Sequence, residues 1–174
     1  MEPLRENHKA LPTSAGSRGA ASPLGEASLL SEQDLYLFNE GSHFRLYEKL
    51  GAHLLSKDGS EGVYFAVWAP DAERVSVIGS FNDWKKNAHR LHPRGTSGIW
   101  EGYVPQARRG NLYKYHIVSR VNGYQVEKAD PFSLFNEIPP KRASIVWDLD
   151  YMWGDREWMK GRHSHNRLDS PIAI

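Results

Sequence analysis

The residues best suited to binding a ligand lie at the end of the stretch Val75–Trp84. Val75 to Ser80 alternates between apolar and small polar side chains, which predicts a strand, and Asn82-Asp83 predicts a turn directly after it. Trp84 follows, so a large flat ring is expected at the lip of a sheet, with the amide of Asn82 close by. Alternatively, Trp84 fills the end of the core, since tryptophan is a mostly buried residue. An exposed ring beside fixed polar groups suits a sugar, which offers C–H faces ringed by hydroxyls.

Two more residues extend this candidate sugar site. Lys114, in the alternating stretch Leu112–Val118, would supply a charged donor, and Tyr124 could add a second ring. The other tryptophans with strand-like surroundings are expected in the core or at an interface: Trp68, Trp100 and Trp147.

No residue pattern predicts catalysis or a metal site. Glycoside chemistry needs two carboxylates on rigid elements, but the close acidic pairs lie in a polar C-terminal segment: Asp148 with Asp150, and Asp155 with Glu157. His163 and His165 could bind a metal only if other ligands converged on them. His116 lies in a strand pattern and is expected to be structural. The sequence contains no nucleophile elbow and no glycine-rich phosphate loop, so we predict no catalytic residue, metal or cofactor.

The overall composition limits the possible partners and locations. The 174 residues carry a formal net charge of +1, which gives no strong field for nucleic acid or an anionic membrane. The absence of cysteine excludes disulfides and thiolate metal sites. The first residues lack the apolar core of a signal peptide, and we expect a cytoplasmic protein. Six Trp and eight Tyr suit a β-rich fold and a ligand surface built from ring faces.

Composition and the positions of turn-forming and helix-capping residues along the chain predict four segments. Residues 1–30 are rich in Pro, Gly, Ser and Ala, and we expect a disordered tail. Residues 31–57 are expected to be a helical leader. Ser31 and Asp34 should cap a first helix that Gly41 ends, and a second helix over Phe44–Leu50 should end at Gly51. Residues 58–150 should form a β domain, and residues 151–174 a linker followed by the start of a further strand.

The β domain is predicted from short alternating stretches separated by turn residues. These stretches are Val63–Trp68, Val75–Ser80, Ile99–Val104, Leu112–Val118, Tyr124–Glu127 and Ser144–Trp147. Asn122-Gly123 is a strong type I′ hairpin signal between two of them. Short strands at near-regular spacing predict an antiparallel β-sandwich, and the lack of helix–strand alternation argues against a nucleotide-binding α/β fold.

Several motifs, in order, resemble one family, the N-terminal carbohydrate-binding module (family 48) of bacterial 1,4-α-glucan (glycogen) branching enzymes. The motifs are Tyr64–Pro70, Val75–Trp84, Gly98–Gly102, Leu112–Tyr115 and Glu127–Pro131, and the leader Tyr36–His53 also resembles these enzymes. The resemblance implies an immunoglobulin-like module packed against a (β/α)8 barrel of the α-amylase clan. That barrel cleaves an α-1,4-glucan by a retaining mechanism and transfers the fragment to a 6-hydroxyl. Its paired carboxylates match no position here, and Ser170–Ile174 resembles the start of its first strand.

The related module of the AMP-activated kinase β-subunit implies which residues contact the glycan. Its stacking Trp after the Phe-Asn turn matches Trp84, and its sugar-contacting Lys matches Lys114. Its second stacking Trp corresponds to Tyr124 here, and an Asn near the end of that module falls near Ser144. At these two positions this sequence departs from the residue types of the related module. The expected glycan contacts are therefore Trp84, Lys114, Asn82, Tyr124 and Ser144.

The functional expectation is a glucan-binding or bracing module of a branching enzyme. Its expected partners are an α-1,4-glucan and the catalytic barrel of the same enzyme, and this 174-residue chain alone should be inactive. Two alternatives remain open. One is a stand-alone glucan-binding or regulatory module without an enzyme, and the other is a fragment of a debranching enzyme.

Overall fold

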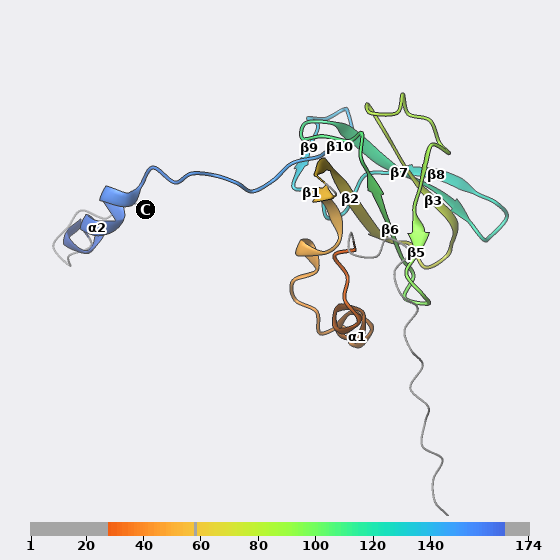
Figure 1. The fold of residues 1–174 in the computed structure, drawn as a ribbon, viewed down its shortest axis with the longest axis horizontal. Helices are drawn as coiled ribbons and strands as arrows, with labels where there is room; N and C mark the ends of the chain where they lie inside the picture. Colours follow the sequence, from red (N-terminus) through yellow and green to blue (C-terminus); the bar gives the residue numbers. More distant parts are fainter. Residues whose placement is uncertain (1–27, 58, 166–174) are drawn as a thin grey trace, which may run out of the picture.

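The computed structural model of the 174-residue chain describes residues 28–57 and 59–165, and it consists mainly of two antiparallel sheets (Figure 1). The first sheet has the order β1-β2-β6-β5, with β1 Gly51–Lys57, β2 Ser60–Trp68, β6 Ile99–Val104 and β5 His92–Pro93. The second has the order β4-β3-β7-β10-β9, with β4 His89–Arg90, β3 Ala72–Gly79, β7 Leu112–Ser119, β10 Ser144–Ile145 and β9 Phe135–Asn136. β8 (Gln125–Lys128) adds to β7. The predicted immunoglobulin-like β-sandwich is confirmed.

The core lies between the sheets because each central strand alternates its side chains across them. Val63, Phe65 and Val67 of β2 face Val75 and Val77 of β3, with Tyr113 and Tyr115 of β7, in one buried cluster. Trp100 also belongs to this cluster and donates its indole N–H to the carbonyl of Ala69 at 3.0 Å, as its predicted core position requires. The Asn122-Gly123 hairpin is confirmed, since both residues have positive φ (57° and 62°).

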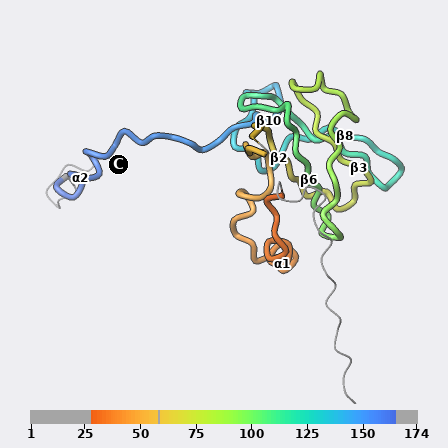
Figure 2. Tube along the Cα trace, in the orientation of Figure 1, coloured from red at the N-terminus to blue at the C-terminus, as the bar shows by residue number. Residues whose placement is uncertain are grey.

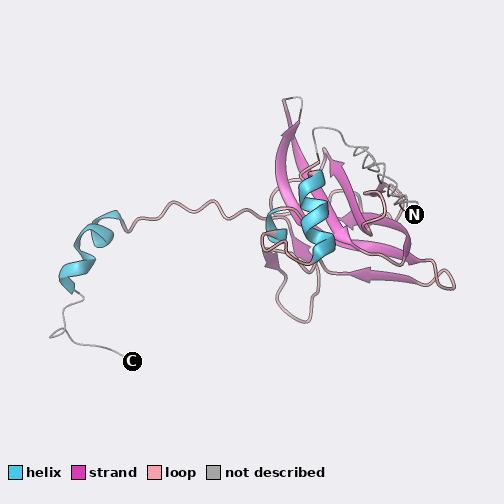
Figure 3. Cartoon of the chain, turned by 90° about the horizontal axis from the view of Figure 1, so that it is seen from below, coloured by secondary structure: helices cyan, strands magenta, loops and turns pink. Residues whose placement is uncertain are grey.

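A leader of helices covers the outer face of the first sheet (Figure 3). α1 (Glu32–Glu40) begins at Ser31, whose hydroxyl accepts from the Asp34 amide while the Asp34 carboxylate accepts from the Ser31 amide, as predicted. Burial opposes ionisation of Asp34, but hydrogen bonds from Ser31, His43 and Lys49 outweigh it and hold the pKa of Asp34 well below its usual value. Leu35 and Phe38 then pack on a second cluster with Tyr64 and Ile99, so the molecule has a third, helical layer.

The leader differs from the prediction in two places. The expected helix Phe44–Leu50 is only a 3-10 turn, η2 (Leu46–Glu48), and residues 51–57 form strand β1. The expected helix end at Gly51 is also wrong. Its φ of +103° instead begins a strand, and an added Cβ would lie 3.1 Å from the Phe132 carbonyl oxygen. All seven residues of β1 then pair with β2, because cross-strand partners outweigh the weak local helix signal.

The ends of the chain also depart from expectation. Residues 1–27 and 166–174 lie outside the described residues, so the predicted tail and the predicted strand start at Ser170–Ile174 lie there too, but Leu30 is buried, 3 % exposed, within the leader cluster. The C-terminal segment, predicted as a linker, runs extended from the sandwich and then forms α2 (Arg156–His165), well apart from both sheets (Figure 2). Within the described residues, neither helix is long and apolar enough to cross a membrane.

Candidate functional site

The turn after β3 presents Trp84 with its side chain 38 % exposed. The Gly79 carbonyl accepts from the amides of both Asn82 (3.1 Å) and Trp84 (3.0 Å), which closes the turn. Asp83 and Trp84 both have positive φ, 53° and 59°. Such values are uncommon for residues other than glycine and cost about 1 kcal/mol or more each, so the surrounding bonds must enforce them.

Asn82 supplies those bonds from its side chain and so builds the turn. Its Oδ1 accepts from the Gly79 amide at 2.9 Å, and its Nδ2 donates to the Val77 carbonyl at 3.0 Å and to His89 Nδ1 at 2.9 Å. Both amide hydrogens are thus used, and the residue is only 8 % exposed. The structure thus places the polar atoms of Asn82 in the turn, and direct contact between Asn82 and a sugar stays a prediction.

Lys114 lies beside Trp84 on the outer face of the second sheet. Its position in β7 pairs with Ile78 of β3, and its Nζ lies 5.9 Å from the centroid of the Trp84 ring. The two residues share a shallow hollow of about 490 Å³. An exposed indole and an ammonium donor therefore meet in one place, as the sequence predicted.

The opposite wall of this hollow was not anticipated. It consists of the loop between β9 and β10, which contributes Glu137, Pro140, Lys141 and Arg142, while Glu127 of β8 flanks Lys114. The loop is held at its neck, where Glu137 donates its amide to the Ala143 carbonyl at 3.0 Å and accepts from the Ala143 amide through Oε2 at 3.0 Å. The Pro139-Pro140 pair followed by Lys141-Arg142 indicates an exposed turn in the sequence, but only the fold shows which surface it borders.

Tyr124 and Ser144 do not join this hollow. Tyr124 is 65 % exposed, but it lies at the far end of the β7–β8 hairpin, about 17 Å along the strand from Lys114 at the usual rise per residue. Ser144 is fully buried, accepting from the Asp130 amide at 2.9 Å and donating to Asn136 Oδ1 at 3.2 Å. The hydroxyl therefore holds the β9–β10 corner together, and a role for Ser144 as a sugar contact stays a prediction.

The remaining candidates have structural surroundings. His116, predicted to be structural, is 4 % exposed and bonds Gln125 Oε1 at 3.2 Å. Trp68 packs edge-on against Phe38 at 6.1 Å between centroids, and Asp148 pairs with Arg109 at 3.3 Å. No group of three or more His, Cys, Asp or Glu side chains that could hold a metal occurs in the described part of the chain.

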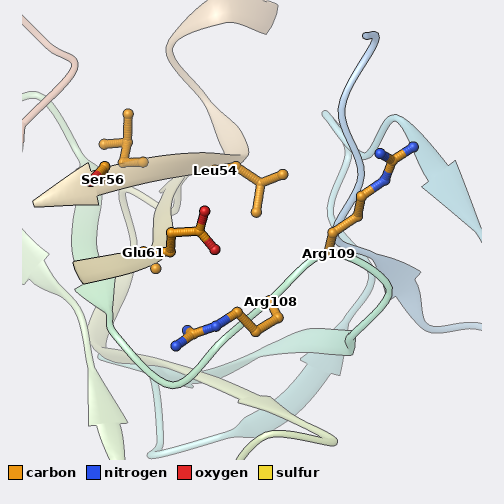
Figure 4. Close-up of a pocket in the computed structure, with 7 residues that line it drawn as sticks. Leu54, Ser56, Glu61, Arg108 and Arg109 are labelled. Atoms are coloured by element: carbon orange, nitrogen blue, oxygen red, sulfur yellow. The ribbon is translucent and has the colours of Figure 1, made fainter. Parts of the chain in front are cut away.

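Exposed apolar side chains gather at one edge of the sandwich, where β1 and β9 are the end strands of their sheets. The surface here, which we call the Trp147 face, comprises six exposed or half-exposed apolar residues: Tyr47, Leu54, Leu134, Phe135, Trp147 and Leu149. They line two adjoining hollows of about 430 and 340 Å³. A third hollow of about 470 Å³ continues from Leu54 and Arg109, with the Glu61 and Arg108 side chains reaching into it from opposite sides (Figure 4).

Comparison with known proteins identifies the class of this domain. Residues 49–133 match the family Carbohydrate-binding module 48 (Isoamylase N-terminal domain). The match begins two residues before β1, in agreement with the finding that residues 51–57 form a strand of the β domain and not part of a helical leader. The domain is a carbohydrate-binding module of family 48.

The relatives found by sequence comparison narrow the class to one kind of enzyme. The chain is 51 % identical over 146 residues to the 1,4-alpha-glucan branching enzyme GlgB of Thermosynechococcus vestitus, covering 83 % of this chain and 19 % of that protein. It is 49 % identical over 148 residues to the enzyme of the same name from Aquifex aeolicus, covering 84 % and 23 %. The chain thus corresponds to the N-terminal portion of such branching enzymes, and it spans about a fifth of their length. Among solved structures, it is similar to Klebsiella pneumoniae pullulanase complexed with maltotriose, with a TM-score of 0.46 and 28 % identity over 57 % of this chain and 10 % of that chain.

Proposed function

We propose that the module binds an α-1,4-glucan in the hollow between Trp84 and Lys114, as the N-terminal part of a cytoplasmic 1,4-α-glucan branching enzyme. The observation that carries this proposal is the exposed indole held 5.9 Å from an ammonium by a turn in a costly conformation. Glucose residues would stack a C–H face on the indole while Lys114, Glu127 and Arg142 offer donors and acceptors to hydroxyls. Fold and site chemistry then agree with the module class.

Binding of this kind would serve the parent enzyme by raising the local concentration of polymer ends near the catalytic domain. Two carboxylates line the Trp84 hollow, but Glu127 is paired with Lys86 and Glu137 accepts from the Ala143 amide, so both hold the surrounding structure. Asp148 is paired with Arg109, and Asp150 lies in the extended segment. We therefore propose that the 174 residues alone transfer no glucan. The debranching alternative is less well supported, because the relatives identical at about half their aligned residues are named branching enzymes.

Electrophoresis through an amylopectin-containing gel tests the binding site. Wild type should be retarded, and Trp84→Ala should reduce the apparent affinity roughly tenfold, because the stacking surface is removed. Trp68→Ala is the matched control, since that indole is also half exposed but lies over the other sheet against Phe38. Equal retardation of wild type and Trp84→Ala, with both folded by circular dichroism, would remove Trp84 from the site.

We also propose a bracing role, in which the Trp147 face packs against the remainder of the parent chain. The face exposes aromatic and aliphatic side chains at the two sheet edges, an arrangement that usually marks an interface. The main chain leaves the sandwich at this same face, from buried Val146 through Trp147 to Tyr151 (Figure 1). The branching-enzyme relatives are four to five times as long as the aligned part, so each has a large further region that could cover the face.

The bracing role can be tested by supplying the remainder of the Thermosynechococcus vestitus enzyme as a separate polypeptide. The wild-type chain should co-purify with it, and the double variant Leu134→Ser/Trp147→Ser should lose that association at least tenfold. Val121→Ser is the control, because Val121 is an exposed apolar residue of the distant β7–β8 hairpin. Association that survives the double variant, or that Val121→Ser weakens equally, would contradict the assignment.

A further inference from the structure

His89 is a side chain near the sugar site that the proposed function does not use. It lies in β4, directly opposite Val77 of β3, and is half buried. Its ring contacts the two residues that begin the Trp84 turn, with Nδ1 2.9 Å from Asn82 Nδ2 and its centroid 5.6 Å from that of Phe81. Phe81 in turn packs against Phe65 of the core at 6.0 Å. The imidazole therefore contacts the turn from β4, whereas Lys114 lies on β7, on the other side of β3 in the sheet order.

The hydrogen bonds around Asn82 dictate which imidazole nitrogen carries the proton. Asn82 Oδ1 must accept from the Gly79 amide and Nδ2 must donate to the Val77 carbonyl, so the amide cannot be reversed. Nδ2 is consequently a donor toward His89, whose Nδ1 must be an unprotonated acceptor. The hydrogen of the neutral ring then lies on Nε2, which is 3.2 Å from Gln106 Oε1 and can donate to it.

Protonation of the ring breaks this arrangement. An imidazolium carries hydrogens on both nitrogens, so Nδ1–H would oppose the Nδ2–H of Asn82. Reversing the Asn82 amide would remove that conflict but would place two donors together at Gly79 and two acceptors together at Val77. The bonds lost in either case are the ones that hold Asp83 and Trp84 at positive φ.

No neighbouring group offers the imidazolium a compensating negative charge. The polar contacts of His89 are the neutral amides of Asn82 and Gln106, and no ion pair to His89 occurs among the residues that the structure describes. The ionisable side chains on the elements packed around it are engaged elsewhere or point to solvent: Lys85 with Asp83, Lys86 with Glu127, Arg108 with the carbonyls of Pro105 and Ala107, buried Glu101 with Tyr64, and exposed Arg90.

We propose that neutral His89 is a positioning residue for the Trp84 turn, and that its protonation releases the turn and weakens glucan binding at that site. The second half rests on the proposed function, whereas the first half concerns the protein alone. Protonation of this ring would thus lower affinity for the polymer without any change at Trp84 or Lys114 themselves.

Nitrogen chemical shifts of the imidazole test the positioning role without any sugar. The wild-type chain at a pH where the ring is neutral should show His89 as the Nε2–H tautomer. Lowering the pH until the ring is protonated should shift the Trp84 backbone and indole resonances together with those of the His89 ring. A His89 in the Nδ1–H tautomer, or a titration that leaves the Trp84 resonances unmoved, would overturn the proposal.

Retardation in the amylopectin gel at the same two pH values tests the consequence. Wild type should lose affinity about tenfold on acidification, while His89→Asn, whose amide oxygen replaces Nδ1 as acceptor, should show no such loss. His89→Leu, which accepts nothing, should be roughly fivefold weaker at both pH values. His92→Asn is the control and should keep the wild-type pH response, since His92 is an exposed residue of β5. A pH response retained by His89→Asn would overturn the proposal. A wild type that is not retarded at any pH would overturn the proposed function. In that case the tautomer measurement alone would decide whether His89 positions the turn.

Discussion

Gly79→Ala is expected to destabilise the folded protein by about 3 kcal/mol or more, because the new methyl group has no space. An added Cβ at this position would lie 2.2 Å from the Leu112 carbonyl oxygen and 2.7 Å from Phe81 Cε1. The first of these is a backbone atom of β7, so the clash can be relieved only by separating β3 from β7. Those two strands form the centre of the second sheet.

The same substitution should also weaken glucan binding in whatever fraction remains folded. The Gly79 carbonyl accepts both bonds that close the Trp84 turn, and its amide donates to Asn82. Urea unfolding followed by circular dichroism measures the loss of stability, and Gly154→Ala provides the control because nothing lies within 4 Å of a Cβ there. A midpoint for Gly79→Ala close to that of Gly154→Ala would contradict the packing of β3 on β7.

Asp130→Ala is expected to cost about 3 kcal/mol or more by leaving buried donors without an acceptor. Asp130 Oδ2 accepts from the hydroxyls of Tyr113 (2.6 Å) and Tyr115 (3.1 Å), and Oδ1 accepts from the Phe132 amide at 2.8 Å. The residue is 5 % exposed, and both tyrosines are fully buried. The variant would leave the Tyr113 hydroxyl and the Phe132 amide without this acceptor, and the Tyr115 hydroxyl with only its longer bond to the Ala66 carbonyl at 3.3 Å.

The burial of the Asp130 carboxyl also leads us to expect that the free energy of unfolding depends on pH. Burial raises the pKa of Asp130 above its usual value, although the hydrogen bonds from Tyr113, Phe132 and Tyr115 oppose the rise. The folded state therefore holds the proton more tightly than the unfolded chain, so this group's contribution falls as pH rises from about 4 through the folded pKa. Asp130→Asn keeps a polar side chain of the same shape and should lack this slope.

Urea unfolding of wild type and Asp130→Asn at pH values from about 4 to 7 measures that contribution as the difference between their unfolding free energies. The difference should move against wild type as the pH increases. A constant difference, or one that favours wild type at higher pH, would mean that the Asp130 carboxylate is not held in a desolvated site.

Much of this architecture follows from local sequence. Strand-like sequence patterns located β2, β6 and β7. Of these three, β7 alternates in burial as a half-buried strand does, whereas β2 and β6 are buried on both faces because the leader covers the first sheet. Asn122-Gly123 and the Ser31–Asp34 pair determined a hairpin and a helix start through backbone geometry that involves only neighbouring residues. Likewise, Trp84 at the end of a strand and Lys114 within another follow from strand and turn chemistry alone.

Only the tertiary structure decided what these residues do for one another. Local sequence did not predict β1, because the stability of this strand comes from its pairing with β2. Gly51 is a local signal for a helix end, which the sheet overrides. Asn82 and Ser144 have the right chemistry for a sugar, yet their hydrogen bonds are satisfied inside the protein by partners that no sequence spacing reveals. The loop of Lys141 and Arg142 meets Trp84, and His89 meets Asn82, because the sheets bring distant segments together. Residue types and local periods specify the strands and turns, whereas burial and hydrogen-bond satisfaction across the folded sandwich select which polar groups stay free for a ligand.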